Sequence, residues 1–141
     1  EHGVKRYALI LLALTGSASA QPAWRPVFSN EDIRVEVDEK TMTLEMVRGH
    51  IIGEAVVRTS QAPGSNFLQE TVGSAQLLMH AQVDCGGEGG TTEYRALSMS
   101  RFPNGQEEKM VIKDKRWNTV RPGTPEAAFS SAICEIADAA G

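Results

Sequence analysis

The sequence predicts an α+β domain: an antiparallel sheet of about six strands carries one C-terminal helix, and one disulfide joins the two. Three observations lead to this fold class. Apolar and polar residues alternate in several short segments between residues 33 and 113, an amphipathic helical pattern follows Pro125, and the only two cysteines bracket the second half of the chain. Consecutive short strands followed by a helix are typical of α+β domains.

Residues 1–20 have the pattern of a secretory signal peptide. Two basic residues precede an apolar run of eight, residues 7–14, and a small-x-small motif ends at Ala20. A transmembrane helix needs about 20 apolar residues, so this run is too short to be one. We expect cleavage after Ala20 and a periplasmic or secreted protein without a transmembrane segment. The cell surface is less favoured, because no cysteine at the cleavage point could accept a lipid.

The expected mature chain forms one domain, residues 31–141, after an extended segment, residues 21–30, in which two prolines flank Trp24. We expect Trp24 to pack on the domain. Residues 21–141 carry 12 basic and 17 acidic residues, a net charge of −5. An acidic chain of this kind argues against nucleic acid as a partner.

Cys85 and Cys134 are predicted to form a disulfide, because two cysteines in an exported chain are most simply one bridge. The closed loop of about 50 residues corresponds to about 4 kcal/mol of stabilisation in the chain-entropy account. A redox or metal-binding pair is the alternative. The wide spacing and the lack of a neighbouring histidine disfavour it.

The first strands are read from strict alternation. Residues 33–37 form a half-buried strand, residues 38–40 a turn, and residues 42–47 a second strand that pairs back on the first as a hairpin. Residues 51–59 form a third strand. Gly53 within it indicates a bulge or a close backbone approach.

The middle of the chain combines a loop with two strands. Residues 60–74 are expected to form a long loop with a short irregular piece near residue 67, either functional or a plain connector. Residues 77–84 form a fourth strand and residues 94–102 a fifth. The glycine-rich turn between them, residues 86–90, lacks the Lys-Ser/Thr ending of a phosphate loop.

A hairpin turn and a capped helix complete the fold. Asn104 and Gly105 both tolerate the positive φ of a tight turn, so residues 107–113 should return as a sixth strand. Thr124 can cap a helix that begins at Pro125. The apolar residues at helical spacing are Phe129, Ala132, Ile133, Ile136 and Ala140.

The sequence carries no catalytic motif. His50 and His80 fall on different predicted strands, and no zinc-ligand spacing surrounds them. The adjacent carboxylates Glu107 and Glu108 would point to opposite faces of a strand. We therefore expect no enzyme activity, no metal and no cofactor.

The best candidate for partner binding is a cluster of basic residues with one aromatic, which stands out in an acidic chain. Such a cluster suits an acidic partner. Two other interpretations stay open: Trp117 lies in the core beneath the helix, and the lysines form a solvated strand face or protect a sheet edge. An unprotected edge would allow a homodimer by strand addition. The cluster comprises Lys109, Lys113, Lys115, Arg116, Trp117 and Arg121.

Single residues spread over most of the chain form a recognisable pattern. They are Trp24, Val37-Asp38, Asp84-Cys85, Tyr94, Trp117, Val120, Pro122-Gly123-Thr124 and Cys134. In these residues the chain resembles the surface-adhesin protein E family. The resemblance implies a small exported bacterial domain with an antiparallel sheet, a C-terminal helix and a disulfide, which binds host extracellular-matrix or serum proteins. The alternative function is a periplasmic accessory or inhibitor protein that binds another envelope protein.

Overall fold

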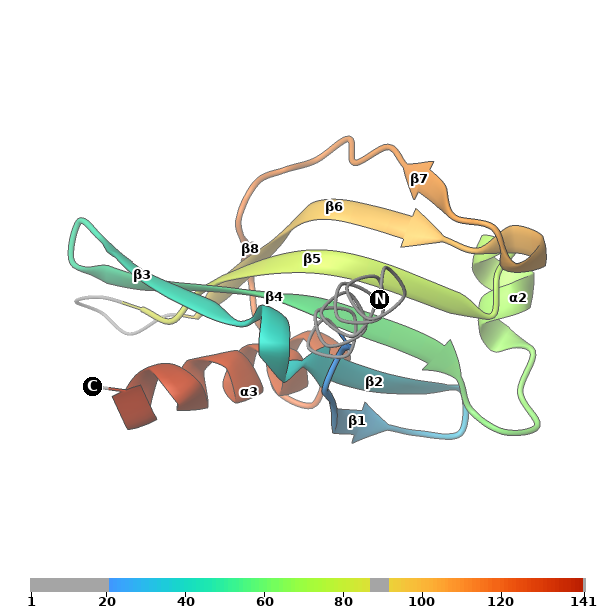
Figure 1. Ribbon diagram of the computed structural model, residues 1–141, viewed down its shortest axis with the longest axis horizontal. Helices are drawn as coiled ribbons and strands as arrows, with labels where there is room; N and C mark the ends of the chain where they lie inside the picture. Colours follow the sequence, from blue (N-terminus) through green and yellow to red (C-terminus); the bar gives the residue numbers. More distant parts are fainter. Residues whose placement is uncertain (1–20, 87–91, 141) are drawn as a thin grey trace, which may run out of the picture.

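The structure is a computed structural model that describes residues 21–86 and 92–140. The predicted signal peptide and most of the glycine-rich turn lie outside these residues. The strands β1-β2-β4-β5-β6-β7 follow one another across an antiparallel sheet, while β3 pairs with β4 and β8 with β6 (Figure 1). The helix α3 packs on one face, so the predicted α+β class is confirmed.

The elements have the following bounds. The strands are β1 (Trp24–Ser29), β2 (Ile33–Asp38), β3 (Thr43–Val47), β4 (His50–Gln61), β5 (Gln76–Asp84), β6 (Glu93–Arg101), β7 (Glu108–Met110) and β8 (Asn118–Thr119). The helices are α2 (Phe67–Val72) and α3 (Pro125–Ala140), with 3-10 turns η1 (Glu39–Thr41) and η2 (Pro103–Gly105).

The predicted hairpin between the first two alternating segments is wrong. β2 and β3 do not pair with each other; they pair with different parts of the same edge of β4. Arg48 and Gly49 have φ of 51° and 84°, which suits a tight two-residue turn, so β3 folds back on β4. Between β2 and β3, Thr41 Oγ1 accepts a hydrogen bond of 2.9 Å from the Val56 backbone N–H.

The expected extended segment near the start of the domain is an edge strand of the sheet. Residues of β1 pair with β2 from Trp24 opposite Asp38 onward, with an irregularity between Pro26 and Phe28. The Asp38 carboxylate also accepts a 2.8 Å hydrogen bond from the Ala23 N–H. Edge strands tolerate proline because one side of the backbone has no neighbour to bond.

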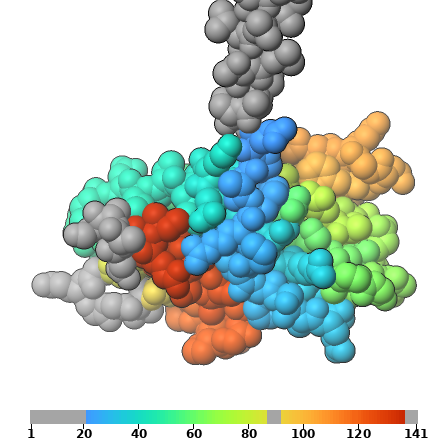
Figure 2. Space-filling view, turned by 60° about the horizontal axis from the view of Figure 1, so that its bottom comes forward, coloured from blue at the N-terminus to red at the C-terminus, as the bar shows by residue number. Residues whose placement is uncertain are grey.

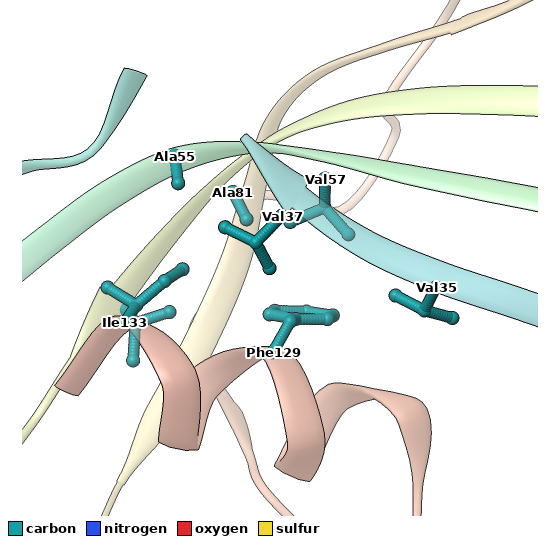
Figure 3. Close-up of a cluster of buried hydrophobic side chains, with 8 residues drawn as sticks. Val35, Val37, Ala55, Val57, Ala81, Phe129 and Ile133 are labelled. Atoms are coloured by element: carbon teal, nitrogen blue, oxygen red, sulfur yellow. The ribbon is translucent and has the colours of Figure 1, made fainter. Parts of the chain in front are cut away.

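The core lies between α3 and one face of the sheet (Figure 3). Phe129 and Ile133 project from α3 onto valine and alanine side chains of the three strands β2, β4 and β5, and all of them are almost fully buried. Figure 2 shows α3, in red, lying against β1, in blue. The sheet residues of the cluster are Val35, Val37, Ala55, Val57, Ala81 and Val83.

Two further segments differ from expectation in extent. The expected loop at residues 60–74 contains the helix α2, whose Leu68 is buried. The sixth predicted strand is shorter, because only Glu108–Met110 pair with β6. The turn between β6 and β7 agrees with prediction, with φ of 55° at Asn104 and 80° at Gly105.

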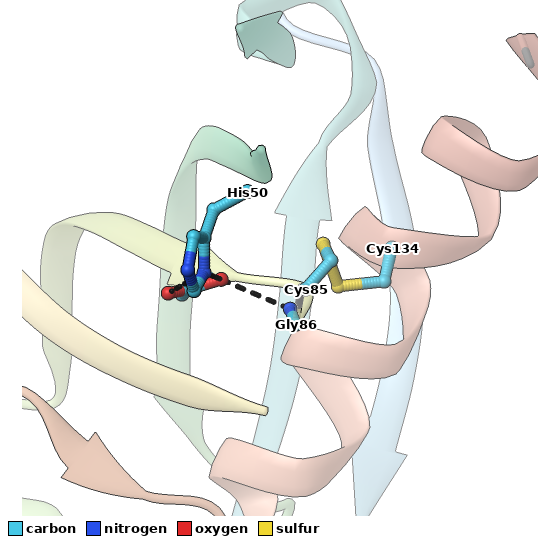
Figure 4. Close-up of a disulfide and its surroundings, with 5 residues drawn as sticks. His50, Cys85, Gly86 and Cys134 are labelled. Carbon is cyan, nitrogen blue, oxygen red and sulfur yellow. Dashed lines mark hydrogen bonds and ion pairs between the residues drawn. A yellow bond between two sulfur atoms is a disulfide. The ribbon is translucent and has the colours of Figure 1, made fainter. Parts of the chain in front are cut away.

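The terminal helix is capped and crosslinked as predicted. Thr124 Oγ1 accepts a hydrogen bond of 3.2 Å from the Ala127 N–H. Cys85, directly after β5, forms a disulfide with Cys134 of α3, with 5.7 Å between the Cα atoms (Figure 4). In the described part of the chain, no helix is long and apolar enough to cross a membrane.

Candidate functional site

A groove of about 630 Å³ lies between β6, the segment around β8 and the start of α3. Arg116, Trp117 and Arg121 line it, so the fold brings together three of the six residues predicted to bind a partner. The connection from β7 to α3 passes along the outer edge of β6, where β8 pairs opposite Glu93 and Tyr94. The other lining residues are Tyr94, Asn118, Thr119, Thr124 and Glu126.

The three lysines of the predicted cluster do not line the groove. Lys109 lies on β7 opposite Ser100, and Lys113 and Lys115 lie on the connection that leads to the groove. All three are exposed to solvent. Lys109 lies toward the opposite end of β6 from the groove, and only Lys113 and Lys115 lie on the segment that leads to it.

Trp117 is half-buried and lies outside the hydrophobic cluster beneath α3. The Arg95 guanidinium carbon is 4.4 Å from the centroid of its ring, a cation–π contact. Arg95 Nε in turn donates a hydrogen bond of 2.7 Å to Gln82, whose amide donates one of 3.0 Å to Glu54. Arg95, Gln82 and Glu54 lie on the sheet face that α3 does not cover. Together they hold Trp117 in its orientation.

The two groove arginines differ in their partners. Arg116 donates hydrogen bonds of 3.1 Å and 3.0 Å to the two carboxylate oxygens of Asp114. These bonds lower the pKa of Asp114 to about 2. Arg121 has no carboxylate within salt-bridge distance among the described residues. Arg121 is therefore the groove cation whose charge is more available to a ligand.

Tyr94 forms part of the floor where the groove approaches the core. Burial raises the pKa of its phenol, the nearby Glu126 raises it further, and Arg121 lowers it. Its ring meets Phe129 edge to face, with 5.7 Å between the centroids. The groove is thus held in place by a core contact with α3.

His50 and His80 lie on the sheet face that α3 does not cover and pair with carboxylates. His50 Nδ1 is 3.0 Å from Asp84 Oδ2, next to the disulfide (Figure 4), and His80 Nε2 is 3.0 Å from Glu54. The described residues contain no group of three or more His, Cys, Asp or Glu side chains that could hold a metal ion.

Sequence reasoning missed the arginine that stacks on each tryptophan. Arg58 lies 4.2 Å from the centroid of the Trp24 ring and bonds Glu36 at 2.7 Å and 3.0 Å. Alternation places Arg58 and Arg95 on the polar face of their strands. Which aromatic each one meets depends on how the strands are ordered.

Fold and groove together define a disulfide-linked antiparallel α+β domain with a basic groove beside the start of its helix. No protein-family model, curated protein or solved structure matches the chain. The resemblance to the surface-adhesin protein E family stays a prediction.

Proposed function

We propose that the chain is an exported, non-catalytic protein-binding domain whose groove binds an acidic segment of a partner protein. The observation that carries the proposal is the meeting of Arg116, Trp117 and Arg121 around one groove. Tryptophan and arginine are the residue types that most often dominate binding energy at protein interfaces.

Charge supports the acidic nature of the partner segment. Lys113 and Lys115 are exposed on the connection beside the groove, although the chain as a whole has a net charge of −4. A local cationic surface on an acidic protein attracts acidic partners and repels basic ones. Arg95 holds Trp117 in position, which lowers the ordering cost of binding.

The disulfide supports export, because such bridges are typical of oxidising compartments.

The resemblance to the surface-adhesin protein E family favours a host matrix or serum protein as the partner. The absence of a lipid-accepting cysteine at the expected cleavage point favours the alternative, another envelope protein. Cell fractionation separates these two cases, because only a surface-exposed or released protein can meet a host partner.

Binding can be measured against immobilised matrix and serum proteins and by pull-down from a periplasmic extract. We expect a partner in one of the two, bound more weakly as salt rises. Arg121→Glu and Lys113→Glu should reduce binding at least tenfold. Lys40→Glu is the matched control, because Lys40 is exposed in η1 at the opposite side of the sheet.

Two results would count against this function. Binding that is insensitive to salt and to Lys113→Glu and Arg121→Glu would rule out the basic groove as its basis. A loss with Lys40→Glu equal to that with Arg121→Glu would show a general charge effect instead of a local site.

A further inference from the structure

A second cavity, of about 370 Å³, adjoins the groove and has an apolar floor. It lies against the helix-facing side of the sheet, beyond the start of α3, and Figure 1 shows that α3 underlies only part of the length of the long strands. Past the helix, half-buried side chains of β5 and β6 continue the apolar face of the sheet. The apolar lining residues are Val35, Val57, Leu77, Met79, Ala96, Met99, Ile112 and Phe129.

The inner wall of this cavity is the core itself. Val35 and Val57 are 1% exposed and Phe129 is 2% exposed, and all three line the cavity as well as belonging to the core cluster. Met79 and Met99, which face each other across β5 and β6, form the adjoining floor. Methionine side chains adapt to ligands of irregular shape. The volume falls within the range of about 300–1,000 Å³ that is usual for ligand sites.

The cavity and the groove share one polar boundary. Tyr94, Asn118 and Glu126 line both of them. A ligand on the apolar floor would thus have one end among polar groups, with Arg121 on the groove side. The charged residues that line the cavity itself are the carboxylates Asp114 and Glu126. Asp114 accepts the hydrogen bonds of Arg116, and Glu126 lies at the shared boundary, where Arg121 lines the groove.

We propose that the cavity binds a free fatty acid, with the aliphatic chain on the methionine floor and the carboxylate at Arg121. The apolar floor requires a chain without polar groups, because a buried polar group without a partner is costly. The cation at the groove side favours a carboxylate head over a neutral or positive one. This inference does not require the protein partner proposed above, since the ligand can be titrated directly.

The test is a calorimetric titration of the oxidised protein with decanoate below the concentration at which it forms micelles. Decanoate should bind, decanol more weakly and decylamine most weakly. Octanoate should bind about 15-fold more weakly than decanoate, which corresponds to two methylene groups. Equal affinity for decanoate and decylamine would overturn the assignment of the head to Arg121. Binding of a lysophospholipid in preference to decanoate would overturn the free acid as ligand.

Matched substitutions locate the chain and the head. Met99→Gln, within the cavity, should weaken decanoate binding at least tenfold, whereas Met46→Gln should leave it unchanged, because Met46 is 66% exposed on β3. Arg121→Gln should weaken decanoate but not decanol, and Arg34→Gln, exposed on β2, should change neither.

In contrast to Met99→Gln, the substitution Thr59→Val should not weaken decanoate binding. Thr59 also lines the cavity, and its replacement by valine makes the wall more apolar at nearly constant size, so decanoate should bind at least as tightly. Equal affinities for Met99→Gln and Met46→Gln, both folded by circular dichroism, would overturn the cavity as the chain site.

Discussion

Gly53 of β4 and Ile133 of α3 approach so closely that a side chain at Gly53 has no room. A Cβ atom built there would lie 2.5 Å from Ile133 Cγ2. β4 pairs without interruption at this position, so the glycine marks a close approach of strand and helix and not a bulge. α3 can pack this close to β4 only because residue 53 is a glycine.

Gly53→Ala should therefore destabilise the protein by about 1–3 kcal/mol through overpacking. Chemical denaturation measures the loss in the free energy of unfolding. Ile133→Leu removes the Cγ2 branch at nearly constant volume, and in that background Gly53→Ala should cost much less. An undiminished cost in the double variant would contradict the proposed contact.

Removing the disulfide should loosen the attachment of α3. Replacing Cys85 and Cys134 together by alanine is expected to lower the free energy of unfolding by about 4 kcal/mol, because the unfolded chain regains the freedom of a loop of about 50 residues. Denaturation with and without a reductant provides the control. Reductant should lower the stability of the parent protein to that of the double variant and leave the latter unchanged.

The Thr41 hydroxyl accepts the backbone hydrogen bond of Val56 on β4, at the gap where neither β2 nor β3 pairs with β4. Thr41→Val keeps the shape but leaves the Val56 N–H without its acceptor, which should cost about 1–2 kcal/mol. Thr41→Ser retains the hydroxyl and should cost less than half as much. If serine and valine were equally destabilising in a denaturation experiment, the hydrogen bond would not be the cause.

Tyr94 should make stability depend on alkaline pH. Its pKa is raised above the ordinary value of 10.0, chiefly by burial, so the folded state favours the neutral phenol. The stabilisation is fully present below about pH 10 and is lost as the pH rises through the higher folded-state pKa. Stability measured across this range should fall more steeply for the parent than for Tyr94→Phe. Parallel curves would contradict the raised pKa.

Each tryptophan should report the loss of its stacked arginine. Arg95→Gln is expected to cost about 0.5–1 kcal/mol of stability and to change the fluorescence of Trp117. Arg58→Gln is the matched variant for Trp24. A spectral change of the same kind from both variants, absent in the exposed-arginine variant Arg34→Gln, would confirm local stacking.

The elements with strong local signals were predictable. Alternation marked β2, β3 and β5, the Asn104-Gly105 pair marked its turn, and the start of α3 followed from its capping threonine and first-turn proline. Each signal depends on backbone geometry within a few residues, so no distant contact was needed to read it.

The pairing of strands was less predictable. β3 could pair with β2 through a turn at Asp38–Lys40, or with β4 through a turn at Arg48 and Gly49. The sequence pattern of Asp38–Lys40 was compatible with either pairing. β8 was missed because its partner β6 is distant in sequence. β1 pairs with the next strand, β2, but Pro26 interrupts its strand pattern. The basic residues were found by composition, but only Arg116, Trp117 and Arg121 meet at the groove.

By itself the sequence determined the fold class, the disulfide pairing and the start of the terminal helix, because two cysteines allow one intramolecular bridge and capping residues mark where a helix begins. The tertiary structure alone decided the order of the strands, the contact of Arg95 with Trp117 and the apolar cavity beside the groove. These features depend on which surfaces meet after the chain has folded, and residues far apart in sequence carry no local signal of that meeting.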